Sequence, residues 1–288
     1  MLAAGENALV IRNTAGVEVP VQVADVHRLR LVPASSADIL ALEEIAALGW
    51  RAPATAWLGR WLLRAAGGWT GRGNSVLPLG PPGRPLDDAL AEVTRWYAEQ
   101  GLPARIQLPL PAREPLRRAL DARGWAGYND SQMLTAPVAA VLAAAGGADG
   151  GPDVMLDTAP SADWLAAYHY RGGTRLPEVA VRVLTGADRP VFATVRDGGA
   201  VVAVGRAVLD AGWAGVTALE VAPSHRRRGL AAAVTRALAE WARAGAAGRM
   251  WLQVADGNAA AHGLYHRLGF RPHHRYQYRL QPGQRRPP

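Results

Sequence analysis

One stretch of the chain combines a β-rich segment, several arginines and a glycine directly before a helical pattern. Thr217 to Val221 has the composition of a strand, and Pro223 should end its pairing because proline has no N–H to donate. The arginines and the glycine lie within 226–231, and apolar residues recur at helical spacing from Leu230 onward. A loop of this kind directs several backbone N–H groups toward one point at the positive end of the helix dipole, which favours a bound phosphate.

Each residue type in this loop suits such a site for its own reason. Gly229 permits close approach of a ligand, Ala231 keeps the first helical turn open, and the arginines add positive charge. The candidate phosphate-binding residues are Arg226, Arg227, Arg228, Gly229, Leu230 and Ala231. Taken alone, these residues could also form a basic helix N-terminus on a solvated face.

A second group of residues follows the strand-like segment Arg249 to Val254. Residues 258–270 read Asn-Ala-Ala-Ala-His-Gly-Leu-Tyr-His-Arg-Leu-Gly-Phe. This segment resembles the N-x-x-A-x-x-L-Y-x-x-x-G-F signature of the GNAT superfamily of N-acetyltransferases, and residues 226–231 resemble its [Q/R]-x-x-G-x-[G/A] loop. The two motifs occur in the family's order and are separated by a helix and a strand, as the GNAT fold requires.

The resemblance implies that acetyl-CoA is the acyl donor, that residues 226–231 bind its pyrophosphate and that no metal is needed. Leu219 and Val221 are matched to the strand whose backbone hydrogen-bonds the pantetheine amides, a form of strand addition between splayed strands. The asparagine matched by Asn258 contacts the pantetheine arm or supports the acetyl site in the family. Asn258 is equally suited to cap a helix.

Transfer of an acetyl group from a thioester to an amine needs a base for the amine and an acid for the departing thiolate. The resemblance implies that Tyr265 is this acid, and its ordinary pKa of about 10 leaves it protonated at neutral pH. A core tyrosine that locks its helix is the alternative. Glu220 is the first candidate for the base and His225 the second. Alternation along the strand places Glu220 on the opposite face from Leu219 and Val221, without showing which face meets the substrate.

The acceptor site is expected between Ala162 and Gly186 and near the strand around Arg206, because family members vary there. An aromatic and basic cluster in this segment favours an acidic acceptor, such as an amino-acid carboxylate, if it lines the groove. An ordinary amphipathic helix with its arginines in water is the alternative. The cluster consists of Tyr168, His169, Tyr170, Arg171 and Arg175, of which Tyr168, Arg171 and Arg175 are the candidate substrate-binding residues.

The pattern of elements around these motifs occurs twice. A helix, a strand, a helix and a strand are expected after residue 230, and the same order is expected after residue 87. Gly124-Trp125 and Gly269-Phe270 are related by a shift of 145 residues. The expected fold class is therefore α/β, with a mixed twisted sheet and flanking helices, in a tandem of a degenerate and an active GNAT unit.

The first copy lacks the chemistry of the second. At the same shift, Tyr265 corresponds to Leu120 and Asn258 corresponds to Arg113. No phosphate loop precedes the first helix of the pattern. We therefore expect the first copy to support the fold or to shape the acceptor site.

Composition shifts divide the chain into five expected segments. A short β segment should contain a hairpin between residues 8–12 and 17–23, and a helix should follow with Ser36 ahead of it and Gly49 near its end. The N-terminal strands resemble part of the SH3- or Tudor-like barrel of actinobacterial tandem GNAT proteins, some described as N-acetylglutamate synthases. The expected limits are 1–35 for the β segment, 36–136 for the degenerate unit, 137–152 for a linker, 153–282 for the catalytic unit and 283–288 for a tail.

Composition also restricts the function. The 288 residues include no cysteine, which excludes disulfides and an acyl-cysteine intermediate. The net charge of +8 comes entirely from arginines spread along the chain, which argues against nucleic-acid binding. We expect a cytoplasmic monomer or homodimer, without membrane association, that binds acetyl-CoA and a small amine. Two alternatives are an acetyl-CoA-binding sensor without turnover and a factor that acetylates protein or chromatin.

Overall fold

A computed structural model describes residues 4–5, 8–12, 18–22, 34–146, 151–170, 173 and 175–284. The chain forms two compact units, Met1–Pro33 and Ala34–Pro288. The first unit holds a sheet of β1 (Ala4–Gly5), β2 (Ala8–Arg12) and β3 (Glu18–Gln22), in which β2 pairs antiparallel with both neighbours. The predicted hairpin strands are therefore present, whereas the likeness to an SH3- or Tudor-like barrel stays a prediction.

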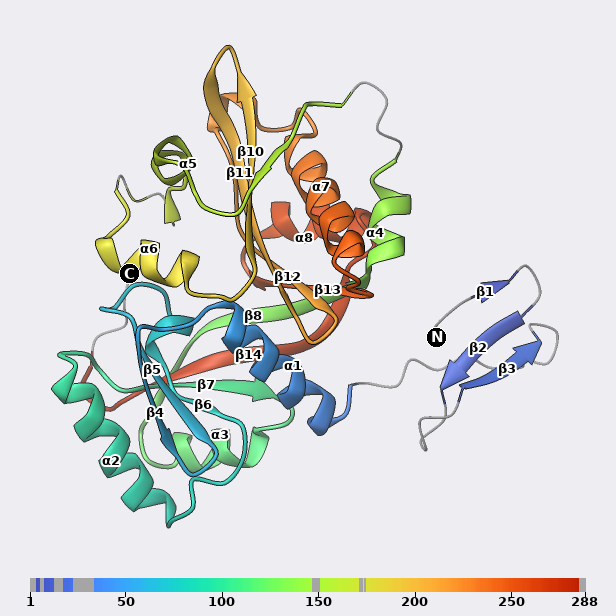
Figure 1. Cartoon of the computed structure of the whole chain (residues 1–288). Coiled ribbons are helices and arrows are strands. Elements are labelled where there is room, and N and C mark those ends of the chain that lie inside the picture. Colours follow the sequence, from blue (N-terminus) through green and yellow to red (C-terminus); the bar gives the residue numbers. More distant parts are fainter. Residues whose placement is uncertain are drawn as a thin grey trace. The chain divides into compact units, whose positions relative to one another are not determined.

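The second unit is built around one eight-stranded sheet of order β7-β14-β8-β13-β12-β11-β10-β9 (Figure 1). Neighbouring strands are antiparallel except β12 and β13, which are parallel. The sheet is thus mixed, as predicted. Its strands, in sheet order, are β7 (Arg105–Leu110), β14 (Arg271–Leu280), β8 (Ala126–Pro137), β13 (Arg249–Ala255), β12 (Trp213–Val221), β11 (Ala200–Asp210), β10 (Pro190–Asp197) and β9 (Met155–Asp157).

The two sequence halves exchange strands within this sheet. Strand β8, which ends the first half, lies between β14 and β13, and β14, which ends the second half, lies between β7 and β8. Each half therefore completes the sheet of the other. Because these pairings join residues more than a hundred positions apart, neither half forms this arrangement alone.

The predicted repeat of helix, strand, helix and strand is present. In the first half α2 (Leu86–Glu99) and α3 (Glu114–Asp121) flank β7, and in the second half α7 (Leu230–Ala244) and α8 (Ala259–Arg267) flank β13. The first half also has a small sheet of β4 (Ala54–Leu58), β5 (Trp61–Ala65) and β6 (Leu77–Pro78). A parallel bridge between Val76, the residue before β6, and Ile106 joins this small sheet to β7. In the second half, the parallel pair β12–β13 makes the corresponding connection.

Helix α1 (Ser36–Gly49) starts one residue away from the predicted cap. Its N-cap is Ser35, not Ser36. The Ser35 hydroxyl accepts a hydrogen bond from the Asp38 backbone N–H at 3.1 Å, and the Asp38 carboxylate accepts one from the Ser35 N–H. This reciprocal capping box needs an acidic residue three positions after the cap, and Asp38 provides it only when Ser35 is the cap.

The segment expected to be a linker, residues 137–152, begins with a packed helix. Val138 and Val141 of α4 (Val138–Ala144) are buried in the core, and α4 contacts α7. Small and glycine-rich composition without an aromatic residue suggested a loose connection, but these two valines have enough apolar surface to fix the helix. The domain limits stay a prediction, and residues 147–150 and 285–288 lie outside the described part of the chain.

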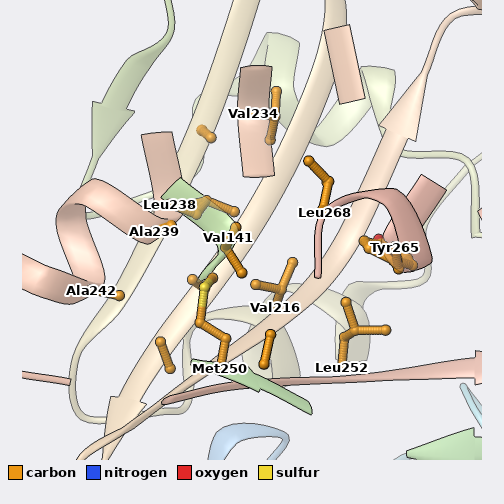
Figure 2. Packing of buried hydrophobic residues seen from close by; sticks show 14 of the residues in the cluster. Val141, Val216, Val234, Leu238, Ala239, Ala242, Met250, Leu252, Tyr265 and Leu268 are labelled. Carbon is orange, nitrogen blue, oxygen red and sulfur yellow. The ribbon is translucent and has the colours of Figure 1, made fainter. Parts of the chain in front are cut away.

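Helices cover both faces of the strands β10–β13. Helices α4, α7 and α8 lie over one apolar core, in which Val216, Val234 and Leu252 are buried (Figure 2). Helices α5 (Ala162–Ala167) and α6 (Glu178–Thr185) belong to a second core on the other side. That second core includes Trp50 and Trp69 of the first half, so the first half contributes to the α5–α6 side of the second half. Within the described residues, no helix is both long and apolar enough to cross a membrane.

Candidate active site

Strands β12 and β13 separate in the middle of the sheet. Their parallel pairing runs from Trp213–Arg249 to Val216–Leu252 and then stops, while β13 continues beside β8. Just beyond, Ala218 has a φ of 52° and the register with β11 shifts, which is a β-bulge. The end of β12, including Leu219 and Val221, therefore has a paired strand on only one side. This opening fits an extended amide-containing chain such as pantetheine.

The loop after β12 presents unpaired backbone donors. A short 3-10 turn (Pro223–His225) is followed by Arg227 and Gly229, whose φ angles are 65° and 81°. Gly229 is the N-cap of α7 and no side chain caps this helix. Among the described residues, none accepts a hydrogen bond from the backbone N–H groups of residues 227–232. A pyrophosphate fits here because these donors and the exposed arginines would otherwise be satisfied only by water.

The predicted phosphate-loop residues differ in exposure. Leu230 is buried in the core below α7, and Ala231 lies in the first turn of that helix. The side chains of Arg226, Arg227 and Arg228 are exposed. Arg226 Nε donates a bond of 3.3 Å to the Val221 carbonyl, which ties the start of the loop to the end of β12.

His225, the second candidate base, is engaged at the edge of the loop. Its Nε2 lies 3.2 Å from the Asp197 carboxylate at the end of β10, and its Nδ1 lies 2.9 Å from the Ser224 hydroxyl. Arg228 approaches the same carboxylate at 3.7 Å. Asp197 thus anchors the loop to strand β10, which suits His225 to a positioning role.

Glu220 points to the opposite side of the sheet from its neighbours. Leu219 and Val221 pack against the core under α7. The Glu220 carboxylate instead accepts a 2.7 Å hydrogen bond from the His169 backbone N–H, and its other oxygen lies 3.5 Å from His169 Nδ1. Strand alternation did not show which side of the sheet Glu220 faces. The contacts with His169 show that it faces the α5–α6 side, where the acceptor site was expected.

Tyr265 lies in α8 beside the core that α7 covers. Figure 2 shows it near one end of the labelled cluster. Its ring meets Phe270 edge to face, with 5.5 Å between centroids. Burial raises the pKa of the Tyr265 hydroxyl above its ordinary value, so this group is protonated at neutral pH. Among the described residues, none forms a hydrogen bond with this hydroxyl.

Asn258 caps α8, because its side-chain oxygen accepts a hydrogen bond from the Ala261 N–H at 3.1 Å. The capping role is therefore present in the structure, and contact with the cofactor remains a prediction for this residue. Asn258 is exposed, so its amide group is also accessible from outside.

The predicted acceptor residues do not form one helix. Helix α5 ends at Ala167 and α6 begins at Glu178, so Tyr168 and Arg175 lie in the connection between them. Tyr168 is buried beside Trp164, with ring centroids 5.6 Å apart, and burial raises its pKa. Arg175 is exposed, and Arg171 lies outside the described residues.

Three residues of the first half lie on this side and were not predicted. Trp50 stacks on Trp69 with centroids 5.4 Å apart, and Trp69 meets Tyr170 edge to face at 5.6 Å. The Arg72 guanidinium lies 4.8 Å from the centroid of the Trp50 ring. No motif marks these positions, because the half to which they belong lacks both signatures. The only signal was an abundance of tryptophan, ten in the chain.

A mixed sheet whose parallel strands β12 and β13 separate before the uncapped N-terminus of α7, with a buried, protonated tyrosine in the core below that helix, is typical of GNAT-type N-acetyltransferases. Residues 36–279 match the family described as probable histone acetyltransferase Rv0428c, C-terminal, and the chain belongs to this family. The match spans both halves. A single family match therefore covers both GNAT-like halves of the chain.

Individual relatives agree with this assignment. The chain is 32% identical over 274 residues to the probable histone acetyltransferase Rv0428c of Mycobacterium tuberculosis, covering 90% of this chain and 79% of the relative. It is 28% identical over 253 residues to the uncharacterized N-acetyltransferase YobR of Bacillus subtilis, covering 85% and 99%. A solved GCN5-related N-acetyltransferase from Kribbella flavida shares the fold, with a TM-score of 0.64, 19% identity and coverage of 88% and 98%.

Proposed function

We propose that this N-acetyltransferase transfers the acetyl group of acetyl-CoA directly to a primary amine in a ternary complex. The observation that carries the proposal is the continuity between the opening of β12 from β13 and the unpaired N–H groups of residues 227–232. An opened strand suits the pantetheine amides and the adjoining loop suits the pyrophosphate, so one extended cofactor would satisfy both. The acetyl end would then lie at the opening.

Two side chains on opposite sides of β12 supply the proton transfers. Glu220 faces the α5–α6 side and takes a proton from the acceptor amine, directly or through water. The amine nitrogen forms a bond to the acetyl carbon and the bond from that carbon to sulfur breaks. Tyr265, which burial keeps protonated, gives its proton to the departing sulfur.

Release of free CoA from acetyl-CoA tests the proposal. Purified protein would be incubated with a panel of amines that includes amino acids, polyamines and lysine peptides, and the acetylated product would be identified by mass. Turnover with at least one amine supports the proposal. Tight acetyl-CoA binding without turnover across the panel would instead favour a sensor, and absence of acetyl-CoA binding would contradict the donor assignment.

The mycobacterial relative is described as a probable histone acetyltransferase, which supports a second candidate, acetylation of a basic protein such as a histone. Binding to DNA that falls steeply with salt, together with acetylation of histone peptides, would favour this candidate. The cytoplasmic location and the monomeric or homodimeric state stay predictions.

A further inference from the structure

Two arginine guanidinium groups lie near the same tryptophan ring on the α5–α6 side of the sheet. The Arg72 guanidinium carbon is 4.8 Å from the centroid of Trp50, and that of Arg206 is 5.6 Å from it. Arg72 comes from the 3-10 turn Arg72–Asn74 of the first half, whereas Arg206 comes from β11 of the second half. The two halves thus bring two positive charges together.

Within the described residues, no carboxylate pairs with either arginine. Arg206 is fully buried and donates to the Leu184 carbonyl (2.6 Å), the Gly49 carbonyl (3.0 Å) and the Thr217 hydroxyl (3.1 Å), while its Nη2 has no partner. Among the residues that the structure describes, Arg72 donates only to the side-chain oxygen of Gln253. Burying a cation without an anion is costly, and a second cation nearby adds to the cost.

The pKa of Arg206 reports this imbalance. Burial and then the charge of Arg72 lower it to about 9 from its ordinary value of 12.5. An anion bound between the two groups would stabilise both charged forms. The arrangement is therefore electrostatically suited to an anionic ligand group.

The two arginines also lie beside the groups expected to act on the acceptor. Trp50 and Tyr168 are buried in the same apolar core, and His169, the residue after Tyr168, donates its backbone N–H to the Glu220 carboxylate. Gln253, the partner of Arg72, is the first residue of β13 beyond the last pair with β12. Arg72 therefore reaches the opening of the sheet from the first half.

We propose that the acceptor is an amine that also carries a carboxylate, and that Arg72 binds this carboxylate beside Trp50 while the amine lies toward Glu220. The inference rests on the proposed function and names the substrate class of the same site. A guanidinium can bind a carboxylate through two parallel hydrogen bonds, and the neighbouring charge of Arg206 strengthens the attraction. The half without GNAT motifs would thus determine acceptor specificity.

Matched acceptors and variants test this inference. Each amino acid in the panel would be assayed beside its carboxamide, together with a lysine peptide, on wild-type protein and on Arg72→Gln, Arg72→Lys and Arg95→Gln. Arg95 is an exposed arginine of α2 in the same half and serves as the control. The thermal midpoint and the KM for acetyl-CoA would be measured for every variant, to show that folding and donor binding are intact.

The expected result has three parts. Wild-type protein should prefer an acid to its carboxamide by about tenfold or more in kcat/KM, because the carboxylate forms charge-assisted hydrogen bonds. Arg72→Gln should abolish that preference through a higher KM for the acid, with little change for neutral amines. Arg72→Lys should keep part of it, and Arg95→Gln should behave as wild type.

Other outcomes separate the inference from the proposed function. Equal or better turnover of carboxamides or lysine peptides by wild-type protein would overturn the inference and leave acetyl transfer supported. An equal loss by Arg72→Gln on acids and neutral amines, with folding intact, would also overturn it, because Arg72 would then only position the sheet opening. If no amine is acetylated at all, the proposed function itself is wrong.

Discussion

At the scale of single residues, the proposed mechanism of acetyl transfer would give opposite tasks to two side chains in different environments. Tyr265 is buried among apolar groups, which favours its protonated form. Glu220 is only partly exposed and is held by one backbone hydrogen bond from His169, which leaves it further acceptor positions for an amine proton. The environments therefore match an acid on one side of β12 and a base on the other.

Replacing Tyr265 by phenylalanine should remove the acid without disturbing the core. We expect kcat for acetyl transfer to fall about a hundredfold, because general acid catalysis contributes about 10²–10⁴-fold. The contact of the ring with Phe270 should persist, so the urea midpoint should change little. Tyr97→Phe, at a buried tyrosine of the first half, should leave kcat unchanged and serves as the control. A Tyr265→Phe enzyme with normal kcat would show that another group protonates the sulfur.

Glu220→Gln should separate the two candidate bases. Glutamine can still accept the hydrogen bond from the His169 N–H but cannot take up the amine proton, so kcat/KM should fall about a hundredfold. His225→Gln should lie within about twofold of wild type, because acid–base catalysis is not expected from that residue. Initial rates of CoA release on both variants measure the difference. The reverse pattern would assign the base to His225.

At the scale of elements, the geometry of the donor site depends on how β12 passes into α7. The strand loses its parallel neighbour, bulges at Ala218 and enters the helix through Gly229, whose φ is positive. A β-carbon added to Gly229 would meet no protein atom within 4 Å. The glycine is therefore required by the backbone conformation, and the space beside it is available to a ligand.

Gly229→Ala should weaken acetyl-CoA binding more than it weakens the fold. The left-handed conformation costs a non-glycine residue about 1 kcal/mol, and the new methyl group would occupy the approach of the pyrophosphate. Gly212→Ala is the matched control, since Gly212 also has a positive φ and open space around it. We expect similar losses of stability in urea for both variants. Calorimetry should show weaker acetyl-CoA binding only for Gly229→Ala, and equal affinities would argue against the assigned loop.

At the scale of the whole molecule, a buried polar network joins the halves that exchange strands. The Glu43 carboxylate of α1 accepts hydrogen bonds from Gln107 of β7 at 2.8 Å and from His274 of β14 at 2.9 Å. Arg64 donates to Gln107, and His273 contacts His274 at 2.8 Å. Because these groups are almost completely buried except His273, each partner is needed to satisfy the others. Unfolding of the two halves should therefore be cooperative.

The free energy of unfolding of the unit Ala34–Pro288 should decrease as the pH falls, because His273 takes up a proton more readily in the unfolded chain than in the folded one. Burial lowers the pKa of His273 to about 4 from 6.5, with further lowering by His274 and Arg249 and opposing effects of Asp38 and Glu43. Between pH 6.5 and pH 4, His273 binds a proton in the unfolded chain but not in the folded chain. The contribution of neutral His273 to the stability of the folded state is therefore present above pH 6.5 and is lost as the pH falls toward 4. After solvent screening we expect a change on the order of 1 kcal/mol.

Urea unfolding between pH 7 and pH 4, followed by tryptophan fluorescence, measures this dependence. The unfolding free energy of His273→Gln should fall less over that range than that of wild type, because glutamine does not titrate. His266→Gln, at an exposed histidine of α8, is the control and should show the wild-type slope. Identical slopes for wild type and His273→Gln would contradict the prediction.

Local sequence was enough to predict the strand–loop–helix junction at residues 226–231, the repeated order of elements and the family, whereas the donor role of that loop and the acid role of Tyr265 stay predictions. A phosphate site made of backbone donors depends on consecutive residues around a strand–helix junction, and residues 226–231 lie next to one another in the chain. The helix cap was missed by one residue, because either of two adjacent serines could have been the cap until the reciprocal bonds with Asp38 were seen.

Features that depend on distant parts of the chain needed the tertiary structure. Strand alternation showed that Glu220 and its neighbours face apart, but only packing against His169 showed which side Glu220 faces. The exchange of β8 and β14 and the approach of Arg72 to Trp50 and Gln253 join segments that no local pattern connects. The loop proposed to bind the donor is thus a local property of the sequence. The side proposed to bind the acceptor is built from contacts between the two sequence halves, which form only when the shared sheet and the cores beside it are packed.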